Sequence, residues 1–143
     1  MHIFTKELRF TDVNSALLVP RHALELFPVP EGDHSMQSEA VDTTGFVWRF
    51  QLSTRSTGRH PKPVLLRSLW HPFVVEKGLH LGDRVTLFLE YDQENGIQYR
   101  VRAQRKTIRL MGYDHWVDVE DLNSSNLQLS SFELQYQFSL AKV

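Results

Sequence analysis

The sequence contains no cysteine and no long apolar run. Without cysteine the chain can form neither a disulfide framework nor a thiolate-based metal site, a composition typical of a reducing, intracellular compartment. No apolar stretch approaches the roughly 20 residues that span a bilayer, and the N-terminus lacks the basic and then apolar run of a signal peptide. We therefore expect a protein without a membrane span or a visible secretion signal.

Catalytic motifs are also missing. The seven histidines show no metal-ligand spacing such as His-x-x-x-His, and neither a Gly-x-Ser-x-Gly motif nor a P-loop occurs. The one dense polar cluster is Asp114, His115, Asp118 and Glu120, and a solvated acidic turn is its commoner interpretation than metal binding or acid–base chemistry. We expect no enzyme activity, cofactor, metal or small-molecule substrate.

The net charge is only −1, which by itself argues against a nucleic-acid-binding protein. The distribution is uneven, because no acidic residue lies between Asp42 and Glu76 or between Glu94 and Asp114. Residues 1–110 hold fifteen Lys and Arg against twelve Asp and Glu, whereas residues 111–143 hold one against five. This asymmetry is compatible with one basic surface on a neutral body.

Period-two alternation recurs along the chain and predicts strands. The length is that of one domain. The expected strands are residues 3–10, 38–41, 46–52, 64–66, 84–91, 97–105, a short one near 116–119, and 127–140, whose phase shifts at residues 130–131. We expect turns at Thr11 and Asp12, at residues 43–45 and at Gly82, and a bend at residues 108–112. Asn95-Gly96 predicts a hairpin turn with positive φ at both central positions.

Only two helices are expected, both short. Pro20 can open a helix over residues 21–26, and Ser68 can cap one that runs to residue 77 and stops at Gly78. This pattern favours an all-β barrel or sandwich. The expected core residues are Trp48, Phe50, Trp70, Phe73, Val74, Leu79, Val85, Leu87 and Phe88.

Several motifs in a fixed order carry a family resemblance. The chain has Trp-Arg-Phe at residues 48–50, a basic loop, Val-Leu-Leu at 64–66, Trp-x-x-Phe-Val-x-x-Lys-x-Leu at 70–79 and Gly-Asp-x-Val-x-x-Phe at 82–88. Before them come Phe-Thr-Lys-Glu-Leu at 4–8, Thr-Asp-Val at 11–13, Val-Pro-Arg at 19–21 and Phe-Pro at 27–28. From about residue 3 to 105, the chain resembles the B3-type DNA-binding domain of plant transcription factors.

The resemblance implies a seven-stranded open β-barrel, the DNA-binding pseudobarrel, with two short α-helices. Residues 1–110 would form this domain, and residues 111–143 an acidic, β-rich C-terminal extension packed on it. The resemblance also implies that two loop arms enter the major groove of double-stranded DNA. The function expected is sequence-specific DNA binding by a nuclear transcription regulator.

The loop at residues 53–63 is basic and matches one of these arms. Arg presents several donors in a fixed geometry that suits guanine in the major groove. On the residues alone, a solvated loop whose charges serve only solubility is an equal alternative. The resemblance favours DNA contact, and the candidate residues are Arg55, Ser56, Thr57, Arg59, His60 and Lys62.

The other arm corresponds to the segment between the first two strands. Asn, Ser and Thr can bond a base edge or a phosphate. This segment is shorter than in many members of the family. Its candidate residues are Lys6, Arg9, Thr11, Asn14 and Ser15.

A third group lies at the start of the second helix. A helix N-terminus together with a hydroxyl and a cation favours an anion. The resemblance implies phosphate contacts by Arg67, Ser68 and His71, although Ser68 can equally be only a cap. Leu69, His71 and Pro72 depart from the small residues that the family usually has beside Trp70.

The alternative function is a protein-interaction pseudobarrel with weak or no base readout. The strand at 127–140 has a long apolar side, so it can complete the barrel or pair with another chain, a second copy included.

Overall fold

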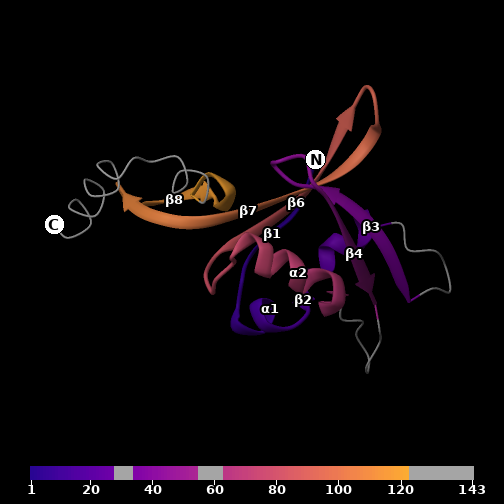
Figure 1. The fold of residues 1–143 in the computed structure, drawn as a ribbon, viewed down its shortest axis with the longest axis horizontal. Helices are drawn as coiled ribbons and strands as arrows, with labels where there is room; N and C mark the ends of the chain where they lie inside the picture. The colour runs from indigo at the N-terminus through magenta and orange to yellow at the C-terminus, as the bar shows by residue number, and fades with distance from the viewer. Residues whose placement is uncertain (28–33, 55–62, 123–143) are drawn as a thin grey trace.

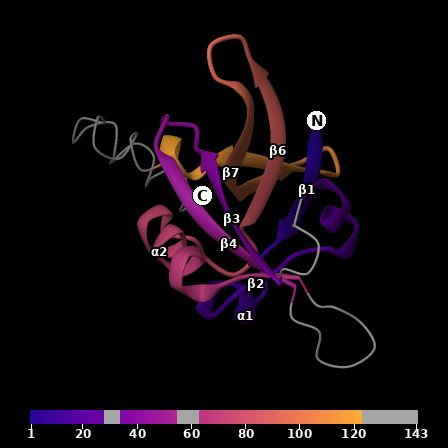
Figure 2. The ribbon, with the colours of Figure 1, turned by 90° about the vertical axis from the view of Figure 1, so that its right-hand side faces the viewer.

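The computed structural model describes residues 1–27, 34–54 and 63–122. Its strands form one mixed sheet in the order β1-β6-β7-β3-β4-β5-β2, with β8 paired to β7 off this path (Figures 1 and 2). The strands are β1 (His2–Glu7), β2 (Leu17–Leu18), β3 (Ser35–Val41), β4 (Val47–Ser53), β5 (Val64–Leu65), β6 (Arg84–Asp92), β7 (Gly96–Leu110) and β8 (Tyr113–Asp118). The predicted mostly-β class is confirmed.

The sheet is open, as predicted, but it is uncurled and does not form the expected barrel. Its path ends in β1 on one side and β2 on the other, and no pairing among the described residues joins the two. Most neighbours are antiparallel. Only β3 and β7 are parallel, through Ala40↔Tyr99 and Val41↔Arg100.

The described ranges contain three helical elements instead of the two expected. These are α1 (Phe10–Asn14), the 3-10 helix η1 (Arg21–Leu26) and α2 (Arg67–Lys77), and residues 119–122 form a further helical turn. None of these helices is long and apolar enough to cross a membrane. The bounds of η1 match the prediction from Pro20, whose φ of −58° suits a helix start.

Two local predictions about helices are wrong. A turn was expected at Thr11 and Asp12, but the Asp12 carboxylate accepts the Arg9 amide at 2.9 Å and holds the first turn of α1. Ser68 does not cap α2, because the helix begins at Arg67 and Leu66 occupies the N-cap position without a side-chain bond. The helix does end at Gly78, whose φ of 62° is left-handed.

The β6–β7 hairpin forms where Asn95-Gly96 predicted it, with a different turn. Gly96 has a positive φ of 74°, but Asn95 does not. Asp92 pairs with Gly96, so residues 93–95 form the loop, and the Asp92 carboxylate accepts the Glu94 amide at 2.8 Å. This is the three-residue hairpin with a left-handed residue at its end.

The bend predicted at residues 108–112 is confirmed only at its end, residues 111–112. Strand β7 continues to Leu110, and the chain turns at Met111 and Gly112 into β8. The pairing of β7 with β8 shifts between Lys106 and Arg109. This irregularity interrupts the period-two pattern, which explains why the strand was predicted to end at residue 105.

Aromatic packing fixes α2 against the sheet. The Phe73 ring lies 5.1 Å from Trp48, 5.6 Å from Phe50 and 5.5 Å from Trp70, measured between ring centroids. Trp70 and Phe73 are fully buried. Removing such a ring costs about 3–5 kcal/mol, so this cluster holds α2 on the sheet.

The predicted core is correct with one exception. Trp70, Phe73, Val74, Leu79, Val85 and Leu87 are buried with Phe50, and Trp48 packs against them. Phe88 is the exception. Successive side chains of a strand point to opposite faces, and since Val85 and Leu87 of β6 point to the core, Phe88 points to the other face.

Candidate functional site

Three segments that are distant in the sequence meet at the end of the molecule that carries α1 (Figures 1 and 2). Strand β2 pairs with β5, and the Val19 amide donates to the Pro63 carbonyl at 2.9 Å. The chain enters α2 directly after β5. The β1–β2 segment, the chain beside the basic loop and the start of α2 are therefore neighbours.

Asp12 holds these segments together. Its buried carboxylate accepts the amides of Arg9 at 2.9 Å and Leu18 at 3.2 Å. Its backbone carbonyl accepts the indole N–H of Trp70 in α2 at 2.7 Å. Sequence reasoning named the Thr-Asp pair only as a turn, so the organising role of Asp12 was missed; it depends on a partner 58 residues away.

Lys6 is the other member of this arrangement. Its ammonium group donates to the Asp12 carboxylate at 2.9 Å and to the Leu18 carbonyl at 2.8 Å. Only 16% of its side chain is exposed. Among the predicted site residues Lys6 therefore has a structural position, with its charge neutralised by Asp12.

The remaining predicted residues of the first arm lie on the surface. Arg9, Thr11, Asn14 and Ser15 are all exposed, on α1 or directly beside it. The Asn14 side-chain amide donates to the Phe10 carbonyl at 2.9 Å. This bond orients the side chain but leaves its oxygen available to an external donor.

The start of α2 is basic. Arg67 is exposed and its Nε donates to the Asn14 carbonyl at 3.4 Å, which joins α2 to α1. Ser68 is exposed, and no acidic residue lies in the first turn. The unpaired amides of a helix start carry partial positive charge, so this end of α2 attracts anions.

His71 lies one turn further along the helix. It is half-buried, and its Nδ1 is buried without a hydrogen-bond partner in the part of the chain that the structure describes. The side chain belongs to the same helix start as Arg67 and Ser68. The structure thus brings together the two predicted groups at residues 6–15 and 67–71.

The second predicted arm falls outside the described residues. This applies to Arg55, Ser56, Thr57, Arg59, His60 and Lys62. The chain on either side is hydrogen-bonded: the Thr54 amide donates to the His34 carbonyl at 2.8 Å, and the Pro63 carbonyl accepts from the Val19 amide. Both attachment points therefore belong to the sheet that carries the other two groups.

The second acid-free stretch of the sequence is not a basic surface. Four of its five cations pair with carboxylates that β6, β8 and the turn before β6 bring to β7, and Arg109 donates to the Gly112 carbonyl. The N···O distances are 2.8 Å for Arg100–Glu90, 2.6 Å for Arg102–Asp118, 3.0 Å for Arg105–Asp83 and 3.7 Å for Lys106–Asp114. Asp114 and Asp118, which the sequence placed in an acidic turn, serve as partners of these cations.

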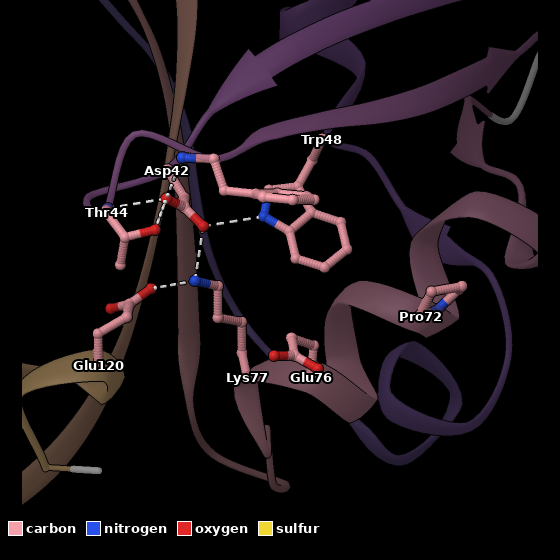
Figure 3. A pocket seen from close by; sticks show the side chains of 8 residues that line it. Asp42, Thr44, Trp48, Pro72, Glu76, Lys77 and Glu120 are labelled. Atoms are coloured by element: carbon pink, nitrogen blue, oxygen red, sulfur yellow. Dashed lines mark hydrogen bonds and ion pairs between the residues drawn. The ribbon is translucent and has the colours of Figure 1, made fainter. Parts of the chain in front are cut away.

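A neutralised cluster also occupies the far end of α2, beside an open cleft of about 620 Å³ (Figure 3). The Lys77 ammonium donates to Asp42 at 2.6 Å and pairs with Glu120 at 2.8 Å. Asp42 also accepts the Trp48 indole N–H at 2.9 Å and the Thr44 hydroxyl at 2.6 Å. This cluster connects α2 to the β3–β4 turn and to the helical turn after β8.

Burial and hydrogen bonding oppose each other at this cluster. Burial alone would raise the pKa of Asp42, but the bonds from Lys77, Thr44 and Trp48 outweigh it and hold that pKa well below its usual range. Burial would lower the pKa of Lys77, but its bonds to Asp42 and Glu120 raise it. Both groups are therefore charged at neutral pH, and their charges are used inside the fold.

Comparisons with known proteins agree with the family resemblance of the sequence. A scan against protein-family models finds no match. The chain is 29% identical over 100 residues to the B3 domain-containing transcription factor NGA4 of Arabidopsis thaliana. That match covers 68% of this chain and 29% of the length of NGA4.

Solved structures with the same fold come from the same plant. The structure of the Arabidopsis FUS3–DNA complex matches with a TM-score of 0.65 and 25% identity, covering 75% of this chain and all of the other. The Arabidopsis thaliana LEC2–DNA complex matches in fold with a TM-score of 0.59 and 21% identity, covering 72% of this chain and 92% of the other. NGA4 is a transcription factor of a non-enzymatic family, which agrees with the expectation that this chain is not an enzyme. The motifs, the sheet and these relatives agree: this chain is similar to the B3 domain transcription factors.

Proposed function

We propose that this protein binds double-stranded DNA in a sequence-specific manner through the end of the molecule that carries α1 and the start of α2, and that it regulates transcription in the nucleus. The observation that carries the proposal is the convergence of three segments at this end. The exposed Arg9 and Arg67 lie on it, and the chain leaves β4 and enters β5 beside it. The FUS3 and LEC2 structures are complexes with DNA, which supports the same ligand for this protein.

The proposed contacts are of two kinds, to base edges and to phosphates. Arg55 and Arg59 read base edges in the major groove, where Arg can pair with guanine through two bonds. Arg67 binds phosphate at the start of α2, where helix amides add to its charge. The other proposed phosphate or base contacts are Arg9, Thr11, Asn14, Ser15, Ser56, Thr57, His60, Lys62, Ser68 and His71.

Lys6 has a different part in the proposal. Its ammonium group is already satisfied by Asp12 and the Leu18 carbonyl. Lys6 fixes the segment that presents Arg9 and Asn14. We therefore place Lys6 at the edge of the DNA interface and not at its centre. Lys6→Met is therefore expected to weaken folding of the first arm as much as DNA binding.

Selection of bound duplexes from a random library tests the proposal. We expect enrichment of one short motif and a steep salt dependence of its binding. Arg55→Ala is expected to cost about 1–3 kcal/mol on that motif and to relax base preference, whereas Arg67→Ala weakens all sequences alike. Equal, sequence-independent losses from both variants would contradict direct readout by Arg55.

The second candidate is a protein-interaction domain with weak base readout. The free edges of β7 and β8, described below, favour it. Selection would then enrich no motif, and binding to a selected and a scrambled duplex would be weak and equal.

Residues 111–143 are proposed to be an extension of the same domain. Two contacts support this: Val119 is buried in the core, and Glu120 pairs with Lys77. If this is so, deleting residues 111–143 exposes Lys77 and core surface and lowers the stability of residues 1–110.

A further inference from the structure

The outer half of β7 and strand β8 form a ribbon of only two strands. Gln104 pairs with Arg84 of β6 on one edge and with Asp118 of β8 on the other. Strand β6 begins at Arg84, so residues 105–110 of β7 have no neighbour on that edge within the described sheet. Strand β8 likewise pairs only with β7 there. The ribbon projects away from the rest of the sheet (Figure 1).

The base of this ribbon is well anchored. Arg84 lies over the Trp116 ring, 4.2 Å from its centroid, and Arg102 and Gln104 both donate to Asp118. The tip has no comparable support. An isolated two-stranded hairpin is marginally stable in water, so the outer part of the ribbon requires a further strand or a covering element.

The tip is apolar as well as unsupported. Ile108 is 55% exposed, Leu110 52%, Met111 94% and Tyr113 75%. Paired residues lie on one face of a ribbon, and Leu110 pairs with Tyr113 while Arg105 pairs with Val117. Leu110, Tyr113 and Val117 therefore share one face, and the opposite face carries the charged pairs of Lys106 and Asp114.

The chain has an unassigned segment of matching pattern directly after this ribbon. Residues 127–140 read LQLSSFELQYQFSL, with apolar side chains at Phe132, Leu134, Tyr136, Phe138 and Leu140 and polar ones between them. This is the pattern of a strand with one apolar face. The described chain ends at residue 122, after one helical turn at the base of β8.

Chain connectivity selects one of the two free edges. A strand that leaves the base and runs toward the tip is antiparallel to β8 and parallel to β7. Only residues 119–126 lie between β8 and this segment, and a parallel connection requires about a dozen residues or more. The free edge of β8 is therefore the accessible one.

We infer that residues 127–140 pair with the free edge of β8 as a third strand, antiparallel to it, and place their apolar side chains on the face of Leu110, Tyr113 and Val117. This strand covers the exposed tip, because its alternating apolar side chains would lie beside those of Leu110 and Tyr113. It also removes one of the two free edges, which would otherwise promote association with other chains. The inference is independent of the proposed DNA binding.

Hydrogen exchange of the full chain, followed by mass spectrometry, tests this pairing. The test variant is Leu134→Asp, Tyr136→Asp and Phe138→Asp together, which puts three charges on the apolar face. The matched control is Gln135→Asp, Gln137→Asp and Ser139→Asp, which puts three charges on the opposite face. We expect the amides of β8 to exchange faster by about tenfold, the equivalent of one or two lost hydrogen bonds, in the test variant only.

The body of the protein supplies an internal reference. Amides of β4 and β6 should exchange equally in all three proteins, because neither variant touches the core. Equal exchange of β8 in all three would overturn the inference. Protection of β8 that appears only with a dimer in sedimentation would also overturn it and would identify a second copy as the occupant.

Disulfide trapping provides a second test that does not depend on charged variants. The chain has no cysteine of its own. With Val117→Cys, we expect an intramolecular disulfide to a cysteine at one of positions 132, 134 or 136, and none to positions 133 or 135, whose side chains point to the other face. Equal trapping at both sets, or only intermolecular bonds, would contradict the pairing.

Discussion

The two acid-free stretches of the sequence look alike, but the fold uses them differently. In residues 95–113, four cations are paired with carboxylates supplied by β6, by β8 and by the turn before β6. In residues 43–75, Arg67 is exposed and bonds only to a backbone carbonyl among the described residues. Among the described residues, the first stretch (residues 43–75) therefore leaves Arg67 available to an external anion, whereas the second (residues 95–113) has four of its five cations neutralised within the fold.

This difference explains how a chain of net charge −1 can present a basic end. Charge density along a sequence does not measure surface potential, because pairing across strands brings together residues that are far apart. The carboxylates of Asp83 and Asp118 lie outside the second stretch and neutralise two of its arginines, Arg105 and Arg102. Cations away from the α1 end thus pair with Asp42, Asp83, Glu90, Asp114, Asp118 and Glu120.

Removing a cation that is buried in the fold should cause the largest loss of stability. Lys77→Met leaves the buried carboxylate of Asp42 without its main partner, and breaking such a pair costs about 3–5 kcal/mol. Urea unfolding measures this loss. The matched control is Arg49→Met, whose pair with Glu39 is exposed on both sides and should contribute about 0–1 kcal/mol. Similar losses from both variants would contradict the distinction between enclosed and open cations.

The same cluster should make stability sensitive to acid. The pKa of Asp42 is lower in the folded state than the usual value of about 3.9, so its contribution is complete above about pH 4 and is lost as the pH falls further. Urea midpoints at several pH values between 5 and 2 measure this. Asp42→Asn should lower stability at pH 5 but flatten the decline below pH 4, and an unchanged slope would exclude Asp42 as its source.

A smaller effect is expected at the second stretch. Arg105 donates to both oxygens of the buried Asp83 and to the Gly78 carbonyl. Because Arg105 is partly exposed, we expect Arg105→Met to cost about 2 kcal/mol of unfolding free energy, less than at a fully buried pair. DNA affinity of the folded variant should not change. Loss of affinity without loss of stability would make β7 part of the interface.

Local signals in the sequence predicted the local parts of this structure. Pro20 and Gly78 set the start of η1 and the end of α2, and Asn95-Gly96 located a hairpin. Alternation located most strands. It failed where β7 shifts its pairing between Lys106 and Arg109, because such an irregularity breaks the period on which the prediction depends.

The sequence predicted which residues belong to the candidate site, but not how they lie relative to one another. The motifs named residues 6–15 and 67–71 separately, but only the fold brings them together, through the Asp12 carbonyl and Trp70 and through Asn14 and Arg67. The ion pair of Lys6 could not be foreseen, since its partners Asp12 and Leu18 meet it only when β1, α1 and β2 pack. Long-range contacts of this kind have no periodic signature in a single sequence.

The most direct test of the two-stretch account is the salt dependence of duplex binding by Arg67→Ala and by Arg102→Ala. Each variant removes one arginine, but Arg102 is paired with Asp118 through two bonds. The account predicts that Arg67→Ala lowers the slope of log affinity against log salt by about one, the share of one phosphate contact, and that Arg102→Ala leaves it unchanged. Equal slopes for both variants, or a reduced slope for Arg102→Ala alone, would contradict it.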